Sequence, residues 1–212
     1  MANFDYGFTL PDGTIIAHGE GVLTKQAFPP ELQLPGTMHV FSPGHETDPS
    51  VPCFQGPAGI LDFDTTCRMP RHVHMTTNTS KPQKFVTEKI LVMNGVALAE
   101  LSGTIYVIPP MTMVIIKPGS PHAWVACPPG VDFQKLGISG DEKLVSEGKF
   151  YAVYEYSDAT TFFPTTQNKR LESVDDYVKC DDLQSIRFPE LDVEGVIKRG
   201  TFVWGKTLKK LS

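Results

Sequence analysis

Residues Glu88–Leu101 read EKILVMNGVALAEL, with one apolar run on each side of Asn94-Gly95. Apolar runs of this length, bounded by turn residues, are typical of β-strands. Asn-Gly between two such runs is the strongest short-range hairpin signal, because a type I′ turn needs positive φ at both central residues. The stretch therefore predicts a β-hairpin and favours a β-rich fold.

Further short strands are expected on both sides of this stretch. The pattern of apolar runs and turns places them at Ile60–Phe63, Thr104–Ile108, Met111–Ile116, His122–Ala126 and Lys149–Tyr156. The 18 Gly and 18 Pro among 212 residues make up about 17%, where about 12% is usual. Short strands at spacings near ten residues, joined by such turns, indicate an antiparallel sandwich or a small barrel.

Helical patterns are few. Two windows are compatible with helix, Asp141–Glu147 and Glu172–Ile186, the second with Ser173 as its N-cap. A late strand is expected within Val196–Trp204. At 212 residues the chain is long enough for one core. We expect a single domain over residues 1–212, with a motif core at about 60–126, an N-terminal arm at about 1–55 and a C-terminal extension at about 157–212.

Composition excludes several classes of function. The formal net charge is −5, and no run of basic residues is longer than a pair such as Lys209-Lys210, which argues against binding nucleic acid. The longest uncharged run, Leu101–Ile116, contains a diproline, so we expect no membrane span. The N-terminus lacks the pattern of a signal peptide, and the four cysteines form no CxxC pair. We therefore expect a cytoplasmic protein with reduced thiols.

Histidines supply the chemical signal. In Arg71-His72-Val73-His74 the two imidazoles are two residues apart, so on a strand they point to one face and can chelate a metal. Glu88 is expected opposite His74 across a long hairpin, and His122 follows a rigid Pro-Gly-Ser-Pro turn. Three imidazoles and one carboxylate suit a divalent transition metal. Apolar side chains share the strand faces of these residues, namely Ile90, Val92 and Trp124, which favours a small apolar or aromatic substrate.

Residues from about 60 to 126 resemble the cupin superfamily. The first cupin motif joins an H-x-H pair to a Glu and a Gly, and this chain offers His72, His74, Glu88 and Gly95. The segment Gly119–His122 is similar to the centre of the second motif. Thirteen residues separate His74 from Glu88, where the family motif has only a few, so the first motif carries an insertion.

The resemblance implies an all-β jelly-roll barrel, also called a double-stranded β-helix, with a metal held by His72, His74, Glu88 and His122. Fe(II) is the expected metal, with Mn, Zn, Ni or Co as alternatives. The expected function is then a non-haem dioxygenase acting on a small phenolic or 1,3-dicarbonyl compound. Two alternatives stay open: a non-redox isomerase, cyclase or decarboxylase, with Glu88 free as a catalytic base, and a non-catalytic small-molecule-binding cupin. A homodimer is compatible with the family.

Overall fold

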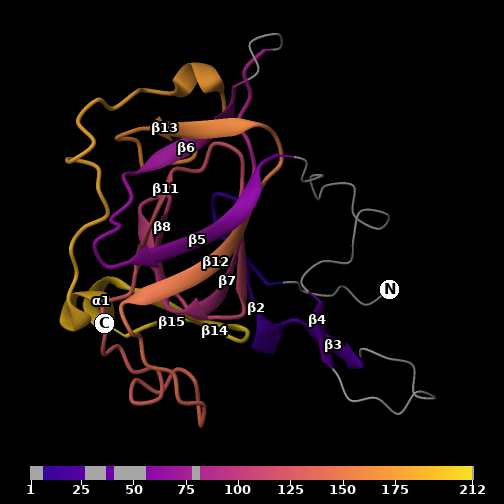
Figure 1. Cartoon of the computed structure of the whole chain (residues 1–212), viewed down its shortest axis with the longest axis vertical. Helices are drawn as coiled ribbons and strands as arrows, with labels where there is room; N and C mark the ends of the chain where they lie inside the picture. Colours follow the sequence, from indigo (N-terminus) through magenta and orange to yellow (C-terminus); the bar gives the residue numbers. More distant parts are fainter. Residues whose placement is uncertain (1–6, 27–36, 41–55, 78–81, 212) are drawn as a thin grey trace.

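Two largely antiparallel β-sheets face each other across an apolar interior (Figure 1). A computed structural model describes residues 7–26, 37–40, 56–77 and 82–211. In spatial order the first sheet contains β1 (Phe8–Thr9), β2 (Ile15–His18), β10 (Thr112–Ile116), β7 (Glu88–Gly95), β12 (Lys149–Tyr156) and β5 (Ala58–Asp64). The second contains β13 (Thr160–Pro164), β6 (His72–Thr76), β11 (His122–Ala126), β8 (Ala97–Leu101), β9 (Thr104–Ile108), β14 (Thr201–Trp204) and β15 (Thr207–Lys210).

The order of the strands identifies the architecture. Strands β5-β12-β7-β10 lie in one sheet and β6-β11-β8-β9 in the other, so from β5 to β12 the chain changes sheet after every strand except β8, which pairs with β9 in the same sheet. This is the arrangement of a jelly-roll barrel, which closes its edges by pairing distant strands. The all-β jelly-roll expectation is therefore confirmed. A separate two-stranded ribbon, β3 (Leu23–Gln26) and β4 (Thr37–Val40), projects beside the barrel (Figure 1).

The N-terminal segment, expected to be an arm, contributes to the barrel itself. Strand β2 pairs with β10, with Ile16 opposite Val114, and extends the first sheet. Ile16 is fully buried, so this part of the segment supplies core side chains.

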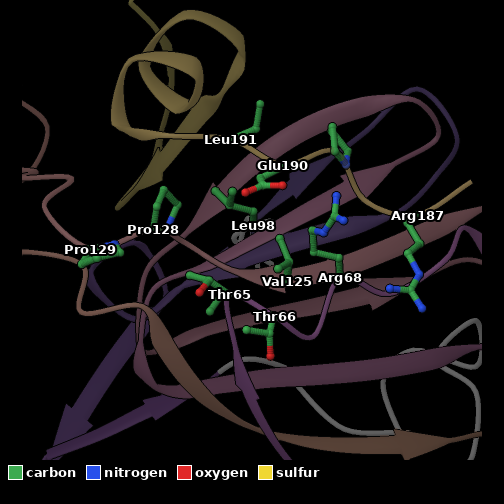
Figure 2. A pocket seen from close by; sticks show the side chains of 12 residues that line it. Thr65, Thr66, Arg68, Leu98, Val125, Pro128, Pro129, Arg187, Glu190 and Leu191 are labelled. Atoms are coloured by element: carbon green, nitrogen blue, oxygen red, sulfur yellow. The ribbon is translucent and has the colours of Figure 1, made fainter. Parts of the chain in front are cut away.

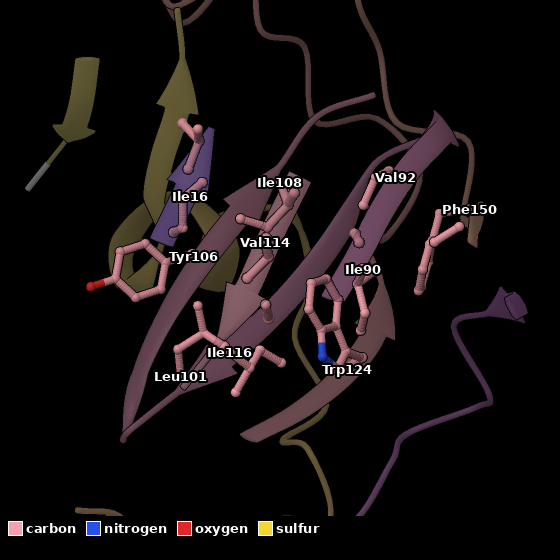
Figure 3. Close-up of a cluster of buried hydrophobic side chains, with 14 of the residues drawn as sticks. Ile16, Ile90, Val92, Leu101, Tyr106, Ile108, Val114, Ile116, Trp124 and Phe150 are labelled. Atoms are coloured by element: carbon pink, nitrogen blue, oxygen red, sulfur yellow. The ribbon is translucent and has the colours of Figure 1, made fainter. Parts of the chain in front are cut away.

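The main core fills the space between the sheets (Figure 3). Ile90 and Val92 on β7 and Trp124 on β11 belong to it and are at most 1% exposed, as the alternation of the two strands predicts. A second core lies outside the second sheet, where Leu98 and Val125 pack under Phe133, Phe188 and Phe202. Strand β8 is therefore buried on both faces, which explains why Val96–Leu101 is apolar almost throughout.

The Asn94-Gly95 hairpin prediction is wrong. Strands β7 and β8 belong to different sheets and do not pair, so the turn carries the chain across the barrel. Gly95 has φ of 72°, but Asn94 does not have a positive φ, as a type I′ turn would require. By contrast, Ser102 and Gly103 both have positive φ and join β8 to β9 as a true two-residue hairpin.

The helical expectations fail in part. Within Glu172–Ile186 only Val174–Asp176 is helical, a 3-10 turn for which Ser173 does form the N-cap. The window Asp141–Glu147 forms no helix. The α-helix α1 is Val193–Arg199, and Asp192 caps it by accepting a hydrogen bond from Gly195 N. It overlaps only the start of the stretch Val196–Trp204, in which the expected late strand is present as β14 (Thr201–Trp204). No helix in the described part of the chain has the length and apolar character needed to cross a membrane.

Candidate metal centre

The four predicted ligands meet at one end of the barrel interior. His72 and His74 lie on β6, and His122 begins β11, where its Cα is paired with that of His72. Glu88 begins β7 in the opposite sheet. All four side chains are buried, with at most 5% of each residue exposed. The two sheets therefore place three imidazoles against one carboxylate.

The route by which Glu88 reaches the histidines differs from the expectation. The segment after β6 does fold back, with a bridge between Met75 and Phe85 and a hydrogen bond from Val86 N to His74 O. The chain then crosses to the other sheet, where Glu88 is paired with Ile116 and Tyr156. Glu88 is thus not the hairpin partner of His74; it faces His74 across the barrel interior.

Backbone carbonyls fix the orientation of every imidazole. Nδ1 of His72 lies 2.9 Å from Pro70 O, Nδ1 of His74 lies 3.0 Å from Thr161 O, and Nδ1 of His122 lies 2.9 Å from Ser120 O. A carbonyl oxygen only accepts, so each Nδ1 carries the hydrogen and the Nε2 atom of each ring is turned to the interior. This outer hydrogen bond is the one that orients metal-binding histidines.

The inward-facing nitrogen and oxygen atoms are held close together. His72 Nε2 lies 3.2 Å from His74 Nε2, and Glu88 Oε2 lies 3.4 Å from His74 Nε2 and 2.9 Å from His122 Nε2. Neither Glu88 Oε2 nor His122 Nε2 has a hydrogen bond of good geometry within the described residues. Buried acceptors that face one another repel unless a cation lies among them. The three Nε2 atoms lie within 4.8 Å of one another, a grouping that can hold a metal ion. The donor set therefore fits a divalent transition metal.

The protonation states agree with this fit. Burial, followed by the nearby His122 and His74, holds the pKa of His72 well below its ordinary value, so its ring is neutral at pH 7. Burial alone would raise the pKa of Glu88, but His74 and His122 outweigh it and hold this pKa well below its usual range. A neutral imidazole and an ionised carboxylate are the forms that bind metals.

Two aromatic residues complete the site, and sequence reasoning assigned them no role there. Tyr156 is paired with Glu88 on the neighbouring strand and its ring centre lies 4.6 Å from that of His74. Burial, then the charge of Glu88 and a hydrogen bond to it, raises the pKa of the Tyr156 phenol. Phe162 is paired with His74 on β13 and stacks on His72 with ring centres 4.2 Å apart. Side chains alternate along β12, so either Tyr154 and Tyr156 face inward or Glu155 does. Only the sheet pairing decides which of these two faces points to the interior.

Comparison with known proteins yields little beyond the fold. No family model and no curated protein sequence matches the chain. Among solved structures the chain is similar to a dTDP-4-dehydrorhamnose 3,5-epimerase from Bacillus anthracis str. Ames, solved with TDP and PPi bound. The two share 11% identity over 83% of each chain, with a TM-score of 0.40. A likeness this distant carries no statement about function. The jelly-roll strand order, read from the structure itself, is the fold that the cupin resemblance implied.

Proposed function

We propose that this chain is a metal-dependent enzyme that moves a proton on a small carbonyl compound, as non-redox isomerases, cyclases and decarboxylases do. One observation carries the proposal: three imidazole lone pairs and an ionised carboxylate converge in a buried site, with a protonated phenol beside the carboxylate. Pairs of titratable groups whose environments separate their pKa values are typical of acid–base catalysis.

In this proposal His72, His74 and His122 hold a divalent metal, because their Nε2 atoms form the preoriented group. A bound divalent cation would polarise the carbonyl of a substrate as a Lewis acid. The backbone carbonyls that hold each Nδ1 keep the imidazoles from rotating, so little ordering is needed on binding.

Glu88 and Tyr156 then transfer the proton, as base and acid. The Glu88 carboxylate removes a proton from the carbon next to the substrate carbonyl: the C–H bond breaks, an O–H bond forms on Glu88, and the electron pair is taken up by the carbonyl oxygen. Tyr156, whose raised pKa keeps its phenol protonated, donates a proton to the resulting enolate. Tyr156 recovers its proton from Glu88, with which it is paired on the neighbouring strand, and this transfer restores both groups.

The surroundings indicate the kind of substrate. Phe162, 36% exposed, stacks on His72 at the outer side of the site, and Tyr156 borders it on the other sheet. Two aromatic rings beside a polar centre favour a flat apolar or aromatic body attached to the reacting carbonyl.

A second candidate is the Fe(II)-dependent dioxygenase that the cupin resemblance implies. The position of Glu88 favours it, because Oε2 points at the imidazoles from 2.9 Å and 3.4 Å and its pKa is low. In that case Glu88 is a fourth ligand and not a base. A phenolic or 1,3-dicarbonyl substrate would react with O₂ in the same site.

The Glu88→Gln variant separates the two. Purified wild type and variant are loaded with Fe(II), Mn(II) or Zn(II), and bound metal is measured by elemental analysis, with the His72→Ala/His74→Ala double variant as the metal-free control. Each protein is incubated with a panel of aryl ketones and 1,3-dicarbonyl compounds in D₂O, with and without O₂. If Glu88 is the base, the Glu88→Gln variant retains its bound metal, and only the wild type incorporates deuterium into the substrate in the absence of O₂. If Glu88 is a ligand, the Glu88→Gln variant loses its bound metal, and turnover by the wild type consumes O₂. Wild type that binds no metal would refute both.

A further inference from the structure

A second cavity lies on the far side of the second sheet, away from the metal centre. It measures about 470 Å³, within the range of small-molecule sites. Leu98 and Val125 line it with their outward faces, and Ala126 lines it at the end of β11 opposite His122. Four residues along a strand separate these two ends of β11 by about 13 Å. The cavity is therefore distinct from the site of the proposed reaction.

The cavity is apolar at one end and cationic at the other. Figure 2 shows Pro128 and Pro129 toward one end, Arg68 and Arg187 toward the other, and Leu98 between them. Such a gradient matches a ligand with an apolar body and a charged head. Flat or alkyl groups bind to accessible proline and leucine side chains, while guanidinium groups bind planar anions through paired N–H donors.

The two arginines are not neutralised by the protein. Within the described residues Arg71 and Arg170 form ion pairs with carboxylates, but Arg68 and Arg187 form none. The side chain of Arg68 makes one long contact, from Nη1 to Phe188 O at 3.4 Å. Glu190 also lines the cavity, and it forms no ion pair with any residue in the described ranges. The three side chains leave a net charge of +1, which suits a monoanion better than a dianion such as a phosphate monoester.

We propose that this cavity binds a small amphipathic monoanion, an aromatic or alkyl body that ends in a carboxylate or sulfonate. Arg68 and Arg187 bind the anionic head, and the body lies against Pro128, Pro129 and Leu191, which unlike Leu98 and Val125 are not fully buried. Glu190 sets the preference for a single negative charge. The site is independent of the proposed reaction, because none of its residues contacts the metal centre.

The test uses 2-naphthalenesulfonate, whose sulfonate is a weak metal ligand, and the neutral methyl 2-naphthyl sulfone. Binding to the full, metal-stripped chain is measured by isothermal titration calorimetry. Loss of a charged hydrogen bond predicts binding about tenfold weaker for Arg68→Gln, for Arg187→Gln and for the neutral sulfone. Glu190→Gln is expected to tighten binding of the sulfonate. Arg170→Gln, in a different part of the surface, is the matched control and should bind like the wild type.

Clear outcomes overturn the proposal. The proposal is refuted if the wild type does not bind 2-naphthalenesulfonate or binds the sulfone equally well. It is also refuted if the arginine variants bind with unchanged affinity. Arg68→Gln also removes the contact with Phe188, so its melting temperature is checked; Arg187 is exposed and tests the charge without that complication. The His72→Ala/His74→Ala variant should retain full affinity. Loss of binding there would place the anion in the barrel instead, whatever becomes of the proposed reaction.

Discussion

Replacing His122 by Ala tests the metal centre where its contacts are tightest. His122 Nε2 lies 2.9 Å from Glu88 Oε2, and its ring is 4.3 Å from that of His72. The variant removes one of three imidazole donors from a preoriented group. Because loss of even an outer-shell partner costs about 10–100-fold in metal affinity, we take the loss here as about 100-fold.

The consequence for stability follows from linkage. Metal supplied at about 100 times its Kd stabilises the stripped wild type by about 2.7 kcal/mol, and a 100-fold weaker site gains only about 0.4 kcal/mol at that concentration. For a domain of this length each kcal/mol shifts Tm by about 2–4 °C. The expected rise in Tm is therefore about 5–10 °C for the wild type and about 1 °C for His122→Ala.

The assay is thermal unfolding of EDTA-stripped protein with increasing Fe(II), Mn(II) or Zn(II). The matched control is His18→Ala, which removes another buried histidine, one that stacks on Trp204 outside the centre. This control lowers Tm but should keep the metal response. The reasoning is refuted if no divalent transition metal raises Tm of the stripped wild type, or if His122→Ala responds as strongly as the wild type.

Three further predictions concern groups outside the metal centre. Arg71→Ala leaves the buried Glu100 without the guanidinium that lies 2.6 Å away and should cost about 3 kcal/mol in urea unfolding; a loss below about 1 kcal/mol would contradict this. Burial raises the pKa of Asp12, but hydrogen bonds from neighbouring hydroxyls and a backbone N–H outweigh it and lower this pKa from 3.8. Asp12 therefore stabilises the fold above that pH, and this contribution is lost as the pH falls through the folded pKa. Between about pH 5 and pH 3 the Tm of the wild type should fall further than that of Asp12→Asn, and equal falls would refute the assignment. Burial raises the pKa of the Cys127 thiol to about 12, so peptide mapping should show it alkylated only after unfolding, whereas the exposed Cys67 reacts in the native protein; early labelling of Cys127 would count against the buried thiol.

Local periodicity was enough to predict which side chains face the interior. His72 and His74 share a face because they are two apart on a strand, and Ile90, Val92 and Trp124 are buried for the same reason. The two-residue turn at Ser102-Gly103 is also local, since it depends on positive φ at both of its residues. These features depend on neighbours in sequence, so a single sequence is sufficient to read them.

The same local patterns gave wrong predictions where pairing with strands far away in the sequence determines the structure. Asn94-Gly95 looks like a hairpin, yet β7 pairs with β10 and β12 and not with β8. Periodicity says which face of a strand is apolar but not which sheet it joins, because that depends on closing the barrel with strands far along the chain. The short helix at Val193–Arg199 was missed because its few apolar side chains also fit a strand.

The sequence by itself therefore determined the β-rich class, the inward faces and the four side chains that we propose as metal ligands. The tertiary structure decided how they meet. Glu88 reaches His74 and His122 from the opposite sheet, and the register of β12 sets Tyr156 beside it. Arg68 and Arg187 come together at one cavity although more than a hundred residues separate them. Such juxtapositions arise from sheet pairing and packing over long sequence distances, which local propensity does not encode.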